Sequence, residues 1–218
     1  MVSFNALAND KDLSQDIMIS ADRQGADLKS KTSIYFDNVV ISQGSLTIYA
    51  DLAKVSTNEK ADKTYSLKGS PAKLKQTLDD GSEVFLEANL IAYQPDNALI
   101  TIKGNAKLQQ LKNKVIADEI IYQIDTEQLI AMGSPALLEQ KVHEGNDISL
   151  EAEHITYQPS LSLISIKGNA KLKQEGSEVH ASEIIYNITT EQMEALGSKD
   201  QAVKTILQPQ SKNDENNE

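Results

Sequence analysis

The sequence predicts an all-β protein of elongated shape that is built from tandem repeats. Residues 69–132 and 133–196 are one unit written twice, aligned without a gap and identical at 35 of 64 positions. Within each unit apolar and polar residues alternate, which is the period of a half-buried strand. Apolar residues make up 39% of the chain, but only 5% of all residues are aromatic and none is tryptophan. Such a lean core favours stacked strands over a compact globule.

A more divergent copy of the unit precedes these two. Three of its positions match the next unit at an offset of 67 residues: Ala21, Asn38 and Ala50 correspond to Ala88, Asn105 and Ala117. The loop 58–63 can absorb the three extra residues. The sequence predicts three segments: a leader remnant and N-terminal arm (1–15), one β domain (16–209), and a disordered polar tail (210–218). The β domain consists of blocks at about 16–68, 69–132 and 133–196, followed by a terminal strand at 197–209.

Turn signals mark where the strands of a unit end. Residues 79–82 (Asp-Asp-Gly-Ser) predict a hairpin. Their counterpart at 143–146 keeps the glycine while the other residues change, so the repeat preserves a backbone shape there. Pro95 and Pro159 end the following segment in the two units, because proline stops a strand or confines it to an edge.

The apolar period of two is seen in the second half of each unit. Isoleucine, alanine and leucine are separated by lysine, serine and threonine in residues 100–108 and again in 164–172, on either side of a Gly-Asn pair. Each of these segments is predicted to be a half-buried strand. Residues 115–124 and 179–188 are rich in Ile, Val and Tyr and predict the next strand of each unit.

One local signal conflicts with an all-β fold. Residues 127–132 and 191–196 consist of good helix formers. We still predict strands there, because a repeating β-ladder overrides weak propensity. The last apolar stretch, 202–207, is predicted to be the terminal strand, with Pro209 after it.

Charge and composition exclude several classes of function. The net charge of −11 repels phosphate backbones, so nucleic acid is not expected as a partner. Cysteine is absent, which excludes a disulfide framework and a thiolate metal site. No run of about 18 apolar residues predicts a membrane helix. Residues 6–8 (Ala-Leu-Ala) have the form of a signal-peptidase site and hint at export, although too few residues precede them for a full leader.

Candidate chemistry is sparse. No nucleophile elbow, zinc-protease motif or P-loop occurs. His143, His154 and His180 occupy positions that hold other residues in the preceding unit, so no histidine site repeats. Residues 79–83 are predicted to be a turn because the alternating oxygen ligands of a calcium loop are missing. We expect no enzyme activity, no metal and no cofactor. Four lysines recur opposite the isoleucines and predict a solvated face or, alternatively, contacts with phosphate groups: Lys103, Lys107, Lys167 and Lys171.

Several segments carry a resemblance to a known family through their order and spacing. They are residues 17–22 and 37–51, the Gly-Ser-Pro-Ala segment 69–72, and residues 104–110 and 203–209. Together they resemble the OstA-like (LptA) family of periplasmic lipopolysaccharide transport proteins, over nearly the whole chain. Members of that family commonly look like two such units, whereas three are present here. In the resemblance, residues 69–72 form an inter-block turn.

The resemblance implies an open, twisted β-jellyroll. Two facing sheets would have a V-shaped section, and their inner faces would form an apolar groove for the acyl chains of lipopolysaccharide. With about three more strands per sheet at about 4.8 Å each, the additional block would lengthen the groove by about 15 Å. The implied function is a non-enzymatic carrier in the periplasm that bridges the inner and outer membranes, with direction supplied by an ATP-driven extractor. The related LptC family fits less well, because it carries an N-terminal membrane helix.

The resemblance also implies which residues contact lipid. Motif matches give Ile17, Ile19, Leu74 and Tyr93, repeat symmetry adds Leu138 and Tyr157, and alternation alone adds Ile100, Ile102, Ile164 and Ile166. For each of them the alternative is a plain core residue that packs one sheet on the other. The corresponding alternative function is a structural or adhesive β-repeat protein with a closed core.

The resemblance further implies assembly through the edges of the sheet. Family members join head to tail by strand addition and dock on the β-jellyroll domains of LptC-like and LptD-like partners. The expected edges are residues 17–21 and 203–207. Their interface residues would be Ile17, Ile19, Val203 and Ile206. The alternative is a quiet terminal strand at each end, protected by Lys11, Asp12 and Lys204.

Overall fold

The computed structural model describes residue 12, residues 14–141 and residues 147–207. In this part of the chain the strands form a single 14-stranded antiparallel sheet. The strands are β1 (Met18–Ser20), β2 (Arg23–Asp27), β3 (Thr32–Gln43), β4 (Leu46–Thr57), β5 (Lys63–Thr77), β6 (Glu83–Gln94), β7 (Leu99–Gln110), β8 (Asn113–Gln123), β9 (Gln128–Gln140), β10 (Ile148–Gln158), β11 (Leu163–Gln174), β12 (Ser177–Asn187), β13 (Gln192–Leu196) and β14 (Lys204–Ile206). Two short 3₁₀ helices, η1 (Pro95–Asn97) and η3 (Pro159–Leu161), follow β6 and β10.

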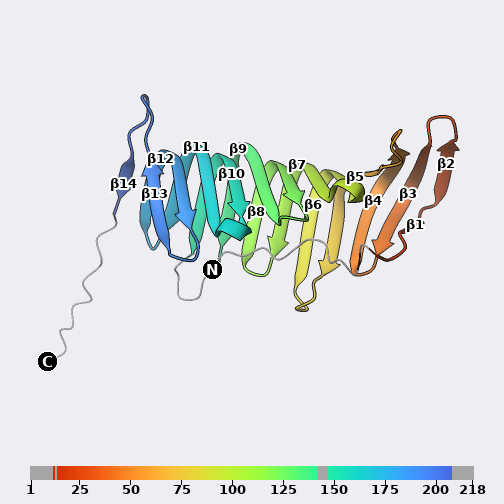
Figure 1. Ribbon diagram of the computed structural model, residues 1–218, viewed down its shortest axis with the longest axis horizontal. Coiled ribbons are helices and arrows are strands. Elements are labelled where there is room, and N and C mark those ends of the chain that lie inside the picture. The colour runs from red at the N-terminus through yellow and green to blue at the C-terminus, as the bar shows by residue number, and fades with distance from the viewer. Residues whose placement is uncertain (1–11, 13, 142–146, 208–218) are drawn as a thin grey trace.

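The strands lie side by side in chain order along the long axis of the molecule (Figure 1). From β3 to β13 each strand pairs with the next one in the sequence. Each end of the sheet is made of two short strands instead of one long strand. At one end β1 and β2 both pair with β3, and at the other end β13 and β14 both pair with β12. Because these ends do not pair with each other within the described residues, the sheet stays open.

The long strands bend near their middle. Each of the nine ladders that join β3 to β12 shifts register once at that point. In β3, β7 and β11 the bend consists of two consecutive residues with positive φ, the second of which is Asn38, Asn105 or Asn169. Asparagine and glycine adopt this left-handed conformation at low cost. In β5 and β9 the bend is the Gly-Ser-Pro-Ala segment, with a cis peptide bond before the proline.

The line of bends divides the sheet into two halves. In β7, for example, half I is residues 99–103 and half II is residues 106–110. Half I ends at the turns 58–62, 95–98, 124–127, 159–162 and 188–191, and half II ends at the turns 44–45, 78–82, 111–112 and 175–176. The buried residues of both halves form one hydrophobic cluster. The folded sheet is therefore an open β-jellyroll whose core lies between its halves, which confirms the predicted fold class.

Small residues line the inner side of the bend. On half II, alanines directly next to the bend pair with one another across the strands, and all are 4% exposed or less: Ala72 with Ala88, Ala106 with Ala117, Ala136 with Ala152, and Ala170 with Ala181. A methyl group occupies little volume, so the two halves can approach closely where they join. The fold thus explains why the first two of these alanine pairs recur 64 residues later in the sequence.

Most of the predicted elements are confirmed. Residues 127–132 and 191–196, despite their helix formers, belong to β9 and β13 apart from Glu127 and Glu191, which lie in the preceding turns. The hairpin at 79–82 joins β5 to β6, with Gly81 at a φ of 79°. Its counterpart at 143–146 lies outside the described residues, as do residues 6–8 and the tail 210–218.

Three expectations need correction. The Gly-Ser-Pro-Ala segment 69–72 is not a turn between blocks but a bend inside β5, because pairing with β4 and β6 continues on both sides of it. The terminal strand is shorter than residues 202–207 and consists of β14 alone. Each 64-residue block contributes four strands, as β9 to β12 repeat β5 to β8. At about 4.8 Å per strand, one block lengthens the sheet by about 19 Å instead of 15 Å.

Candidate functional site

The candidate site is the inner face of the folded sheet. Within the described residues no group of three or more His, Asp or Glu side chains is placed to hold a metal ion. Among the same residues no helix is long and apolar enough to span a membrane. The inner face, by contrast, carries nearly all the buried apolar side chains of the protein.

Strand pairing aligns these apolar side chains into rows that run along the molecule. On half I the isoleucine row, nearest the bend, comprises Ala53, Leu67, Ile91, Ile102, Ile120, Ala131, Ile155, Ile166 and Ile184. The tyrosine row, nearest the turns, comprises Tyr65, Tyr93, Ile100, Tyr122, Leu129, Tyr157, Ile164 and Tyr186. On half II the leucine row comprises Ile41, Ile48, Leu74, Leu86, Leu108, Val115, Leu138, Leu150, Leu172 and Val179.

Eight of the predicted lipid-contacting residues lie on these rows. Ile102 and Ile166 belong to the isoleucine row. Leu74 and Leu138 belong to the leucine row. The tyrosine row holds Tyr93, Ile100, Tyr157 and Ile164. All eight are 5% exposed or less, so motif matches, repeat symmetry and alternation each placed their residues on the inner face, and contact with lipid remains a prediction.

The two halves pack directly against each other. Side chains of the leucine and isoleucine rows are at most 7% exposed, and most are below 2%. In this state the apolar face is therefore a closed core, and a ligand must separate the halves to reach it. A hollow with a volume of about 420 Å³ lies on the outer face of half II instead and includes the exposed rings of Tyr49 and Phe85.

The tyrosine row lies next to the turns of half I and adds hydroxyl groups to the inner face. The rings of Tyr65 and Tyr93 are 6.0 Å apart between centroids and tilted by 31°. The Tyr93 hydroxyl is buried without a hydrogen-bond partner. Burial raises the pKa of Tyr93 to about 12, and burial also raises the pKa of Tyr65 and of Tyr186. Tyr65, Tyr93 and Tyr186 therefore stay neutral at physiological pH.

The outer face is polar and solvated. Lys103 pairs with Glu119 at 2.9 Å, and the equivalent Lys167 pairs with Glu183 at 3.0 Å. Both lysine side chains remain more than half exposed. The lysines opposite the isoleucines thus face water and neighbouring carboxylates, in agreement with the predicted solvated face.

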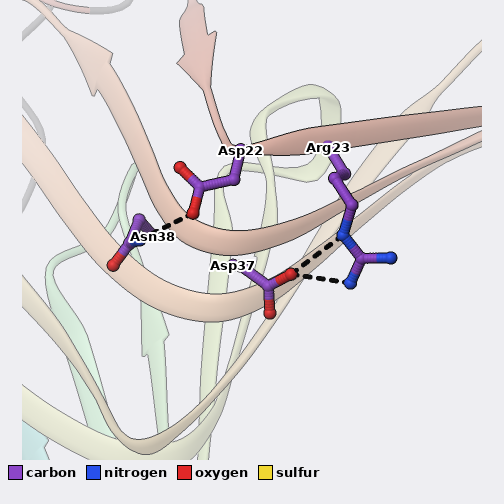
Figure 2. A network of polar contacts seen from close by, with 4 residues as sticks. All are labelled: Asp22, Arg23, Asp37 and Asn38. Carbon is purple, nitrogen blue, oxygen red and sulfur yellow. Dashed lines mark hydrogen bonds and ion pairs between the residues drawn. The ribbon is translucent and has the colours of Figure 1, made fainter.

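The N-terminal edge is held to β3 at its bend. Figure 2 shows Arg23 with its guanidinium against Asp37, at 2.6 Å and 3.1 Å from the same carboxylate oxygen, and Asn38 donating to Asp22 at 2.7 Å. The Asp22 amide also donates to the Asp37 carbonyl at 3.0 Å. These contacts fix the short gap between β1 and β2. Asn169 donates to Glu153 at 2.8 Å in the equivalent place of the third block.

The predicted interface residues lie at the two ends of the sheet. Ile19 lies in β1, and Ile17 immediately precedes it; both are half-buried against the core. Ile206 lies in β14 and Val203 precedes it, with exposures of 39% and 43%. Asp12, predicted to protect the edge in the alternative of a quiet terminal strand, is only 8% exposed and accepts hydrogen bonds from Ser45 and Gln76 instead. Lys11 lies outside the described residues.

A row of buried amide side chains was missed by the sequence reasoning. Gln43, Gln76, Gln110, Asn113 and Gln140 are all 5% exposed or less, at the inner end of half II next to the turns. Polar residues at the end of an alternating segment look like ordinary turn residues. The sequence did carry one sign that these residues are buried, because Gln76 recurs as Gln140 one block of 64 residues later.

Comparisons with known proteins agree on one family. The family model for the LptA/(LptD N-terminal domain) LPS transport protein matches residues 18–128 and again residues 125–192. The lipopolysaccharide export system protein LptA of Haemophilus influenzae is 34% identical over 137 residues, which are 62% of this chain and 80% of that protein. LptA of Escherichia coli K12 is 29% identical over 131 residues, 59% of this chain and 71% of that protein.

A solved structure provides a more distant match. It is the crystal structure of LptH, the LptA homologous periplasmic component of the conserved lipopolysaccharide transport device from Pseudomonas aeruginosa. The two chains are 15% identical, with a TM-score of 0.35 over 91% of this chain and 99% of that one. At that score the overall superposition is poor, and the fold rests on the strand pairing described above.

Proposed function

Because the chain belongs to the LptA/(LptD N-terminal domain) LPS transport protein family, we propose that it is a non-enzymatic periplasmic carrier of lipopolysaccharide. The acyl chains lie between the two halves of the sheet, in contact with the predicted residues of the three apolar rows. The domain 16–209, with its three blocks, acts as one continuous unit. It bridges the inner and outer membranes during export.

The observation that carries this proposal is the continuity of the apolar rows. No charged residue interrupts the isoleucine or leucine row between β4 and β12. Exposing an acyl chain to water costs about 0.8 kcal/mol for each CH₂ group, so a chain of a dozen carbons does not cross an aqueous compartment unaided. A strip of apolar side chains along the whole molecule removes that cost.

The repeat makes neighbouring positions along the rows similar in energy. Ile102 and Ile166, for example, are equivalent positions one block apart and are 0% and 1% exposed. A ligand that moves along such a row meets no single deep trap. Net direction must therefore come from another component of the export system.

The charge of the protein limits how the ligand is held. With a net charge of −11, the protein repels the anionic head group of lipopolysaccharide. Acyl chains must then supply most of the attraction. Binding is accordingly expected to depend weakly on salt.

The two ends of the sheet are the proposed sites of assembly. Strand addition at β1 and β2 of one copy to β13 and β14 of the next would join copies head to tail, with Ile17, Ile19, Val203 and Ile206 at the contact. The same edges would receive the β-jellyroll domains of LptC-like and LptD-like partners. Support comes from large apolar side chains exposed at these ends, with Met18 67% and Leu207 72% exposed.

Site-specific photocrosslinking in cells that make lipopolysaccharide tests the proposal. A photoreactive residue at Tyr93 faces the interior, and one at Lys103 faces water from the neighbouring strand. We expect a lipid adduct at position 93 and none at position 103. Adducts at neither position, in a protein shown to be folded, would refute the carrier function.

The closed packing of the halves favours one alternative function. A structural or adhesive β-repeat protein would keep its interior sealed at all times, as the low exposure of the rows in this state allows. Such a protein takes up no lipid. The crosslinking experiment therefore separates the two functions directly.

A further inference from the structure

The carboxamide row, made of Gln43, Gln76, Gln110, Asn113 and Gln140, lies where an apolar row would be expected. Strand pairing places Gln76 opposite Val84, Val84 opposite Gln110, Gln110 opposite Asn113, and Asn113 opposite Gln140. Each amide in the row is buried to at least 95%. The row is parallel to the leucine row and one step nearer the turns of half II.

Burial of two of these amides, Gln76 and Gln140, is costly for the folded protein. The side-chain carbonyl oxygens of Gln76 and Gln140 are buried and accept no hydrogen bond. A buried acceptor loses its hydrogen bonds to water, and if no other donor replaces them the folded state is destabilised. The same row also holds Val84 and Ile148, which pair with Gln76 and Gln140. Apolar side chains therefore fit at this depth, and folding alone does not explain the two unpartnered carbonyl oxygens.

A polar group that does not belong to the sheet already lies in the row. The Asp12 carboxylate, from the N-terminal arm, accepts hydrogen bonds from Gln76 Nε2 at 3.0 Å, from the Ser45 amide at 2.9 Å and from the Ser45 hydroxyl at 2.6 Å. This contact fixes the orientation of the Gln76 amide, so its unpartnered atom is an acceptor. The groups that satisfy it must be hydrogen-bond donors.

The depth of the row matches the boundary between the apolar and polar parts of an amphiphile. From the bend outward, half II presents alanines, then the leucine row, then the carboxamide row. Half I ends in the tyrosine row, whose Tyr93 hydroxyl is also buried without a partner. Acyl chains that point toward the bend would place their linkage to the head group between tyrosines and amides.

We propose that Gln76 and Gln140 bind the hydroxyl and amide N–H groups that link the acyl chains to the sugar of a glycolipid. The inference rests on the proposed carrier function and deepens it, because it distinguishes a saccharolipid from amphiphiles whose head groups lack donors. Since Gln140 repeats Gln76 one block later, the same contact recurs along the path of the ligand.

The test compares Gln140→Met with Ile148→Met, its neighbour in the same row. Methionine is similar in volume to both residues, but only the first change removes an amide. Affinity is measured for purified lipopolysaccharide and for sodium dodecanoate, whose carboxylate has no donor, and the melting temperature of each variant is recorded. We expect Gln140→Met to weaken lipopolysaccharide binding about fivefold, to leave dodecanoate binding unchanged and to raise the melting temperature. The double variant with Gln76→Met should lose about 25-fold if the two contacts are independent.

The possible outcomes separate this inference from the carrier function. Equal lipopolysaccharide affinity in Gln140→Met, Ile148→Met and the wild type would overturn the amide contact while leaving the carrier intact. A lower melting temperature together with equal losses for both ligands would assign the amide a structural role and also overturn the contact. If the wild type binds neither ligand, the proposed function itself fails.

Discussion

Truncation of Ile102 tests whether the interior is closed in the absence of lipid. Ile102 is 0% exposed and pairs with Ile91 and Ile120 in the isoleucine row. Ile102→Ala removes three carbons, which at about 0.8 kcal/mol each costs about 2.4 kcal/mol in transfer free energy. The gap left behind adds to this, so the expected loss in the free energy of unfolding is about 3–4 kcal/mol.

The assay is urea unfolding followed by circular dichroism, with the slope of the transition compared between variants. Ile121→Ala is the matched control, because Ile121 lies in the same strand as Ile120 but is only half-buried on the opposite face. We expect a loss of about 1 kcal/mol for the control. Ile166→Ala, one block later, should lose the same amount as Ile102→Ala.

A loss below about 1 kcal/mol for Ile102→Ala, with an unchanged slope, would refute the reasoning. It would mean that the side chain already faces water, so that the halves stand apart as an open groove before any ligand arrives. Unequal losses at Ile102 and Ile166 would instead contradict the equivalence of neighbouring positions along the row.

Three further perturbations test other parts of the structure. Burial raises the pKa of Tyr93 from 10.0 to about 12, so the stabilising contribution of its neutral hydroxyl is complete below pH 10 and is lost as the pH rises toward 12. Between pH 8 and pH 12 the free energy of unfolding of Tyr93→Phe should therefore fall by about 2 kcal/mol less than that of the wild type, and equal falls would contradict the assignment. Gly104→Ala should lower the free energy of unfolding more than Gly81→Ala, because both residues have positive φ but only at Gly104 would the new methyl group meet a side chain, with Asn89 Nδ2 at 2.8 Å. By thermal unfolding we expect losses of about 2–3 kcal/mol and about 1 kcal/mol, and equal losses would show that Asn89 moves freely. Arg23→Ala should cost less than about 1 kcal/mol, because the ion pair with Asp37 is 69% and 55% exposed, and a loss above 2 kcal/mol would reveal that the edge depends on this network.

The apolar part of the site was predictable because its signal is periodic. Alternation alone placed Ile100, Ile102, Ile164 and Ile166 on the inner face, and the repeat extended the assignment from Leu74 and Tyr93 to Leu138 and Tyr157. The strand at 191–196 was predicted against its helix propensity, because pairing with β12 contributes more than the weak local preference.

The bend and the carboxamide row could not be predicted from single residues. Gly104-Asn105 and Gly69-Ser70 look like turns in the sequence, since turns and bulges use the same left-handed or glycine conformations. Whether the chain reverses or continues is decided by the neighbouring strands. The amides of Gln76 and Gln140 likewise look solvated until the second half of the sheet is placed over them.

Within the described residues neither end of the sheet carries a distinct cap, and this has a consequence for the length of the molecule. Terminal repeats of most stacked proteins present a polar outer surface that stops further growth. Here the leucine row continues into β1 through Ile19, and only the short strands β13 and β14 follow β12 at the other end. Adding or removing one block of 64 residues therefore changes the length of the sheet by about 19 Å. Every remaining interior side chain keeps the neighbours it had. Duplication of a block is thus a direct evolutionary route to spanning a wider compartment.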